Sequence, residues 1–167
     1  MLHTASKFVN DRRILTQLYY THIRCRLEQS AVLWHSSLTL KNIVDLERVQ
    51  KAAVRVIIGH GYESYSKTLK DLNIETLFER RERLCLRFAK KSLNVENFKH
   101  LFPVYRNNHD MKTRYSPKYE QAKTASNRYK MSTVPHLQRI LNKQALMKNI
   151  DFRKLKISTC HRLPLPH

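Results

Sequence analysis

One short segment places polar, titratable side chains around the single tryptophan of the chain. Residues 26–39 read RLEQSAVLWHSSLT and include Glu28, Gln29, Trp34 and His35. A carboxylate and an imidazole seven residues apart lie on the same side of a helix, so Glu28 and His35 can be read as a general acid and base. The alternative is structural: Glu28 and Gln29 make polar contacts at a helix interface, and His35 caps the helix end. We favour the structural interpretation.

Patterns typical of catalytic and metal sites are missing from the sequence. The aspartates are scattered, whereas two-metal phosphoryl transfer needs clustered carboxylates. Neither a phosphate-binding G-x-x-x-x-G-K loop nor a G-x-S-x-G nucleophile turn occurs. We therefore predict no catalytic residue, no metal site, no cofactor and no small-molecule substrate. The cysteines lack the spacing of a zinc site and are expected to be reduced thiols: Cys25, Cys85 and Cys160.

A single-sign stripe of basic residues is the most specific chemical feature. It lies on a predicted helix that follows Thr76, where acidic residues are segregated to the opposite side. Such a stripe is the expected form of a surface that follows a phosphate backbone, and a merely solvated face is the alternative. The predicted nucleic-acid-binding residues are Arg80, Arg83, Arg87, Lys90 and Lys91, with Lys51 and Arg55 as a second choice.

Tyrosines in the C-terminal third repeatedly stand next to basic residues. Aromatic rings that stack on bases, together with cations that neutralise phosphates, are typical of single-strand binding. Equally, the rings can pack over helices while the cations stay in water. The sequence leaves these two interpretations open for Tyr105-Arg106, Arg114-Tyr115, Lys118-Tyr119 and Arg128-Tyr129-Lys130.

The net charge points to a polyanionic partner. The chain has 32 lysines and arginines against 13 acidic residues, a formal net charge of +19. Because neutralised phosphates release condensed counterions, RNA or DNA is the first candidate, and an acidic membrane surface is the second. No apolar run is long enough to span a membrane. We expect an intracellular protein, nuclear or cytoplasmic. The basic N-terminus is compatible with a mitochondrial presequence, but the same residues serve a predicted helix.

Only 2 glycines are present in 167 residues, which leaves little material for hairpin turns and favours an all-α fold. We expect a small helical bundle over 11–102, followed by a basic tail that is partly disordered or loosely helical. An N-terminal extension occupies 1–10. The tail comprises a Tyr-rich linker at 103–133, a short helix at 134–148 and an irregular end at 149–167. Within the bundle, hydrophobic periodicity and capping residues predict helices at 11–35, 40–58, 64–72 and 77–93, with a short amphipathic turn at 96–102.

Helical projection also predicts the core and one buried charge. Arg81 projects from the middle of an apolar helix face, and a buried guanidinium needs a partner, for which Glu28 and Glu47 are the candidates. The predicted core residues are Trp34, Leu46, Val49, Leu84 and Phe88.

The order of the segments resembles a known family. LYYTHIRCRLEQSAVLWHSSLT is followed by KNIVDLERVQKAAVRVIIG, then by YESYSKTLKDLNIETLFERRERLCLRFAKKSL and FKHLFP, and later by RYKMSTVPHLQRILN. Together they resemble the C-terminal part of the reverse-transcriptase reading frame of jockey-like non-LTR retrotransposons. The family pattern is a helix ending in LE…W, then LERVQ, then IETL..RR..L…F. The resemblance covers roughly residues 12–142.

The resemblance implies a thumb-like role for the helices: gripping the backbone of a template–primer duplex. The family's polymerase aspartates belong to the palm, upstream of these motifs, and no matching acidic pair occurs here. We therefore expect a C-terminal piece of an RNA-directed DNA polymerase that is not an enzyme on its own. One departure is Cys25, where members often have proline. The alternative is a basic helical interaction module with no nucleic-acid role.

Overall fold

A computed structural model describes residues 2–9, 11–105 and 117–160, with side chains described as far as Met147. Within those ranges all regular elements are helices, and extended backbone pairs only in a bridge between Val104 and Tyr119. The predicted all-α class is therefore confirmed. The contacts divide the chain into two units, residues 1–85 and 86–167, and each is described by itself. The predicted domain limits remain a prediction.

The segment predicted as one helix over 11–35 is a succession of short helical pieces. A π-helical turn adds a residue to one turn of the helix, which explains why the apolar residues of this segment leave a single face. The run breaks at Ser30, whose φ of 52° is left-handed. The pieces are α2 (Arg12–Leu18), η1 (Tyr19–Arg24), α3 (Cys25–Glu28), α4 (Ala31–Trp34) and η2 (His35–Ser37).

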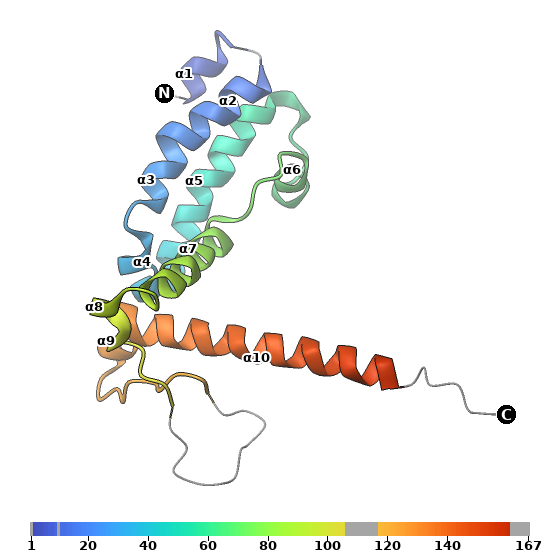
Figure 1. Ribbon diagram of the computed structural model, residues 1–167. Coiled ribbons are helices and arrows are strands. Elements are labelled where there is room, and N and C mark those ends of the chain that lie inside the picture. Colours follow the sequence, from blue (N-terminus) through green and yellow to red (C-terminus); the bar gives the residue numbers. More distant parts are fainter. Residues whose placement is uncertain (1, 10, 106–116, 161–167) are drawn as a thin grey trace, which may run out of the picture. The chain divides into compact units, whose positions relative to one another are not determined.

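The second predicted helix is confirmed at both ends. It is α5 (Leu40–Ile58), and it begins where the side chain of Thr39 accepts a hydrogen bond from the Asn42 N–H. It stops at Gly59, whose φ of 65° is a conformation that other residues rarely adopt. In Figure 1, α5 runs alongside the chain of pieces from α2 to α3, and contacts join α2 to α5.

The next two helices also begin and end close to the predicted positions. α6 (Tyr65–Asp71) is capped by Ser64 and is followed by Asn73, whose φ of 52° reverses the chain direction. α7 (Leu77–Ser92) begins after Thr76. The boundary between the two units falls inside α7.

The core of the first unit gathers residues from five helices. Leu2, from α1 (Leu2–Ser6), is buried in it, so the predicted N-terminal extension contributes to the bundle. α1 packs against α2 and α5, and α6 packs against α5. The buried members of this core are Leu2, Leu15, Tyr19, Ala53, Val54, Ile57, Leu69 and Ile74.

Of the five predicted core residues, two are exposed and three are only partly buried. Val49 and Phe88 are 44% and 41% exposed. On α5 the buried face is rotated by one position, because Gln50 rather than Val49 points inward with Ala53, Val54 and Ile57. The other three predicted core residues are only partly buried: Trp34, Leu46 and Leu84.

Gln50 is buried because both ends of its amide have partners. Its Oε1 accepts a hydrogen bond from the Tyr19 hydroxyl at 2.9 Å. Its Nε2 donates to the Glu75 carbonyl at 2.8 Å. This side chain, 0% exposed, therefore links the first helical run, α5 and the connection into α7.

Besides the end of α7, the described residues of the second unit form one long helix and two short ones. α10 (Thr133–Cys160) includes the predicted helix at 134–148 but continues further, so the expectation of irregular structure over 149–160 is wrong. Neither glycine nor proline occurs between positions 136 and 160 to stop it. Residues 106–116 of the predicted linker and 161–167 of the predicted tail lie outside the described residues. The short helices are α8 (Glu96–Lys99) and α9 (Asn127–Lys130).

Two amide side chains of α10 hold the extended segment 117–123 in the second unit. Asn142 accepts a hydrogen bond from the Tyr119 N–H and donates one to the Tyr119 carbonyl, both at 2.9 Å. One turn earlier, Gln138 accepts from the Ala122 N–H and donates to the Leu101 carbonyl. The segment therefore has a fixed backbone although it belongs to no sheet.

Candidate nucleic-acid interface

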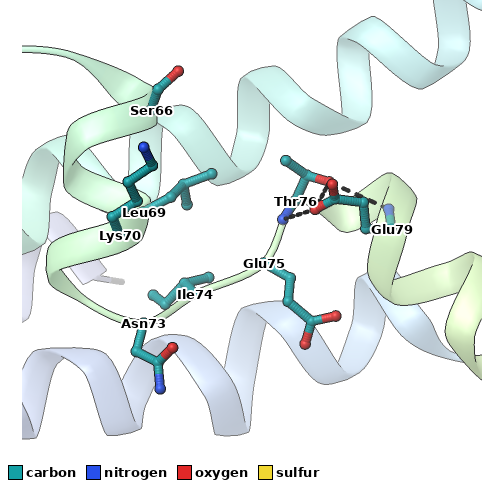
Figure 2. Close-up of a pocket in the computed structure, with 8 residues that line it drawn as sticks. All are labelled: Ser66, Leu69, Lys70, Asn73, Ile74, Glu75, Thr76 and Glu79. Carbon is teal, nitrogen blue, oxygen red and sulfur yellow. Dashed lines mark hydrogen bonds between the residues drawn. The ribbon is translucent and has the colours of Figure 1, made fainter. Parts of the chain in front are cut away.

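The start of α7 is fixed by two separate capping interactions. Thr76 and Glu79 form a reciprocal capping box, drawn with dashed lines in Figure 2. In addition, the carboxylate of Glu47 on α5 accepts the Phe78 N–H at 2.9 Å and the Tyr65 hydroxyl at 2.7 Å. A carboxylate at a helix N-terminus also matches the positive end of the helix dipole. Glu47 thus joins α5, α6 and α7.

Glu28 is the counter-ion of two arginines. Its carboxylate accepts from Nε of Arg24 at 2.6 Å and from Nε of Arg80 at 3.1 Å. Burial alone would lower the pKa of Arg24, but the hydrogen bond and the charge of Glu28 raise it overall. The predicted structural role of Glu28 is favoured over an acid–base role, because its oxygens are already engaged by guanidinium groups.

Arg81 is completely buried, as its position on the apolar face predicts, but the expected ion pair is not formed. Its guanidinium lies over the Trp34 ring, 5.6 Å from the centroid. None of its three side-chain nitrogens has a hydrogen-bond partner among the described residues. Burial lowers its pKa, and the charges of Glu47 and Glu28 oppose that effect from a distance. Cation–π stacking is its closest compensation.

These contacts bring together the three sequence blocks on which the family resemblance depends. LE…W supplies Glu28 and Trp34, LERVQ supplies Glu47 and Gln50, and ETL..RR supplies the rest. We call this set the motif network. Glu28 pairs with Arg80, and the guanidinium of Arg81 lies over the ring of Trp34. Gln50 binds the Glu75 carbonyl, and Glu47 caps the helix that carries both arginines. The motif network consists of Glu28, Trp34, Glu47, Gln50, Glu75, Arg80 and Arg81.

Two of the predicted phosphate-binding residues have intramolecular acidic partners. Arg80 is mostly buried and is bound by Glu28. Arg83 is half exposed and pairs with Glu75. These acids at least partly neutralise the charge of both arginines. The geometry therefore favours a structural role for Arg80, whereas Arg83 can both pair with Glu75 and contact a phosphate.

The other three cations of the predicted stripe are exposed. Arg87, Lys90 and Lys91 lie on the C-terminal half of α7, and no ion pair or hydrogen bond of their side chains occurs with the described residues. Lys90 and Lys91 also occupy the last turn, where positive charge suits the helix dipole. These three side chains have the charge and the exposure that phosphate contact requires.

The second-choice cations on α5 are exposed as well. The side chain of Lys51 is exposed and makes no ion pair or hydrogen bond with the described residues. The Arg55 guanidinium stacks on the Tyr62 ring, 5.0 Å from its centroid. A stacked guanidinium keeps its charge and its donors, so Arg55 remains compatible with phosphate binding.

A surface hollow of about 350 Å³ lies between α6 and the start of α7 (Figure 2). Its carboxylates belong to Glu75 and Glu79. Glu75 pairs with Arg83, and Glu79 completes the capping box with Thr76. Since both acids have structural partners, this hollow offers no free acid–base pair.

Of the tyrosines beside basic residues, one suits packing against the fold and two suit stacking on bases. Tyr119 is buried, with its backbone held by Asn142, which suits a packing role. Tyr105 and Tyr129 are 42% and 46% exposed, which leaves their rings available for stacking. Tyr115 lies outside the described part of the chain.

Other kinds of site were sought over the same ranges. No group of three or more histidines, cysteines and acids that could hold a metal ion occurs among the described residues. In that part of the chain, no helix has the length and apolar character needed to cross a bilayer.

We predict that the Arg81→Met variant is as stable as the wild type, or more stable by up to about 2 kcal/mol. The substitution removes the cost of burying an unbonded charge and keeps an adaptable side chain against Trp34. Urea denaturation followed by the fluorescence of Trp34 measures the free energy of unfolding.

The control for this experiment is Glu28→Gln, which leaves Arg24 and Arg80 without a counter-ion. Its free energy of unfolding should fall by about 2–4 kcal/mol. If Arg81→Met were as destabilising as Glu28→Gln, the guanidinium of Arg81 would have a strong favourable partner, contrary to this account.

Comparisons with known proteins do not add a relative to these observations: no protein-family model, no curated protein and no solved structure matches the chain.

Proposed function

We propose that this chain is the thumb and post-thumb portion of a non-LTR retrotransposon reverse transcriptase. The observation that carries the proposal is the motif network, in which two separate sequence blocks of the family pattern each contact the third. Residues of different motifs that contact one another depend on one another for the fold, which gives a structural reason for the motifs to occur together in one chain. The chain supplies no catalytic residues of its own in this proposal, since the palm aspartates of the family have no counterpart here.

In this proposal the chain binds the phosphate backbone of RNA or DNA through Arg87, Lys90 and Lys91. Their exposure supports direct contact with phosphates. Each turn of α7 advances about 5.4 Å, so cations one turn apart can meet neighbouring phosphates of a strand. Because such contacts carry no sequence information, binding should depend little on sequence.

A second candidate is a basic helical interaction module without a nucleic-acid role. The ion pairs of Arg80 with Glu28 and of Arg83 with Glu75 favour it, because they show that part of the basic stripe stabilises the fold. In that case the remaining cations are only solvated.

Charge reversal distinguishes the two candidates. We expect the triple variant Arg87→Glu, Lys90→Glu and Lys91→Glu to bind a labelled duplex about 10–100-fold more weakly than the wild type, because it loses phosphate contacts and gains repulsion. Fluorescence anisotropy at a fixed moderate salt concentration measures the affinity.

The matched control reverses three exposed cations that do not belong to α7, namely Lys7, Arg13 and Lys41. It has the same net charge as the test variant, so any difference between the two reports position rather than total charge. Equal affinities for both triple variants would support non-specific attraction, and unchanged affinity in both would favour the interaction module.

The proposed origin predicts a specific neighbouring sequence. In the genome, the reading frame upstream of the codon for Met1 should encode, intact or decayed, a palm-type pair of aspartates in an aromatic context. Sequencing that region tests it, and an upstream region encoding an unrelated protein would contradict the proposed origin.

A further inference from the structure

The second unit contains a surface pocket of about 340 Å³ that is separate from the basic stripe on α7. It lies between the 117–123 segment, α9 and the beginning of α10, and Gln138 forms part of its lining. The backbone walls are held in place: the Glu120 N–H donates to the Pro103 carbonyl at 2.8 Å, and Gln138 binds both Ala122 and Leu101. The pocket is therefore built by specific hydrogen bonds and has a defined shape.

Three polar side chains at this pocket are unused. The ring of Tyr129 is 46% exposed, and Lys123 and His100 are exposed beside it. Over the ranges with described side chains, none of these three makes a side-chain hydrogen bond or an ion pair. An aromatic face next to a lysine is the combination that stacks a base and neutralises its phosphate.

One acid in the lining restricts the class of ligand. Glu120 brings a carboxylate to the same pocket, which disfavours a bare phosphate or an acidic peptide. A nucleotide suits the mixture better, because the edge of its base carries hydrogen-bond donors for a carboxylate while its phosphate meets Lys123. The surroundings remain basic, since Arg128 and Lys130 flank Tyr129 and are exposed.

We propose that this pocket binds one nucleotide of a single-stranded nucleic acid, with its base stacked on Tyr129. A base inside a duplex is paired and stacked on both faces, so it cannot enter a hollow of this kind without being extruded. The pocket therefore adds preference for single strands to a chain whose α7 cations bind backbone of either form. The pocket contains no residue of the stripe on α7. An experiment can therefore reject nucleotide binding in the pocket without rejecting the proposed function of the stripe, and the reverse.

The test uses the full chain and two labelled probes, an oligothymidine of about ten nucleotides and a duplex of the same length. Tyr129→Ala should weaken binding to the single strand about tenfold and leave duplex binding unchanged. Tyr129→Phe should restore single-strand binding, because the ring is kept. Lys123→Ala should reduce the salt dependence of single-strand binding by about one released counterion.

Tyr105→Ala is the matched control, because Tyr105 is similarly exposed and does not line the pocket. It should bind both probes like the wild type. The side chain of Tyr129 makes no hydrogen bond with described residues, so circular dichroism should show unchanged helix content in Tyr129→Ala. Unaltered single-strand affinity in Tyr129→Ala, or an equal loss in Tyr105→Ala, would overturn the proposal. Loss in Tyr129→Ala alone, with no effect of the α7 triple variant, would retain the pocket and reject the stripe.

Discussion

The first unit depends on two polar side chains of α5 that reach the beginning of α7. Glu47 accepts the Phe78 N–H, and Gln50 donates to the Glu75 carbonyl. These groups belong to the turn where α7 begins, so their bonds fix both the starting point and the direction of that helix. An unsatisfied buried amide costs about 1–3 kcal/mol, which makes the bonds of the fully buried Gln50 hard to lose.

Arg81 shows the cost of that arrangement. Its guanidinium is 0% exposed and has no hydrogen bond to the described residues, so its burial is destabilising, and stacking on Trp34 offsets only part of that effect. Its neighbour Arg80 solves the same problem differently, since it stays partly exposed and takes Glu28 as counter-ion. Two adjacent arginines of one motif therefore have different roles, one in an ion pair and the other in a cation–π contact. A count of basic residues cannot distinguish these roles.

Local signals in the sequence were sufficient for most helix ends. Thr39, Gly59, Asn73 and Thr76 each act through their own side chain or backbone conformation, so their effect can be read without knowing the fold. The position of the core could not be read in the same way. Gln50 is buried instead of Val49 because its amide forms hydrogen bonds with Tyr19 and Glu75. These partners are 31 and 25 residues away in the sequence, so neither hydrophobicity nor its periodicity reveals them.

The basic stripe illustrates the same limit at the candidate site. Helical projection places five cations on one side of α7, but contacts with residues outside the helix decide which of them meet acids. Arg80 meets Glu28, 52 positions earlier in the chain, and Arg83 meets Glu75 just before the helix. The pocket beside Tyr129 was also beyond prediction, because its walls are set by Gln138 and Asn142, which carry no recognisable signal in sequence.

We propose that the exposed cations of α7 bind nucleic-acid backbone. The salt dependence of duplex binding by the wild-type chain tests it most directly, because each phosphate contact releases counterions. We expect the logarithm of the association constant to fall linearly with the logarithm of salt concentration, with a slope of about −3 or steeper, for the three exposed cations of α7 and any further contacts. A slope near zero would contradict it.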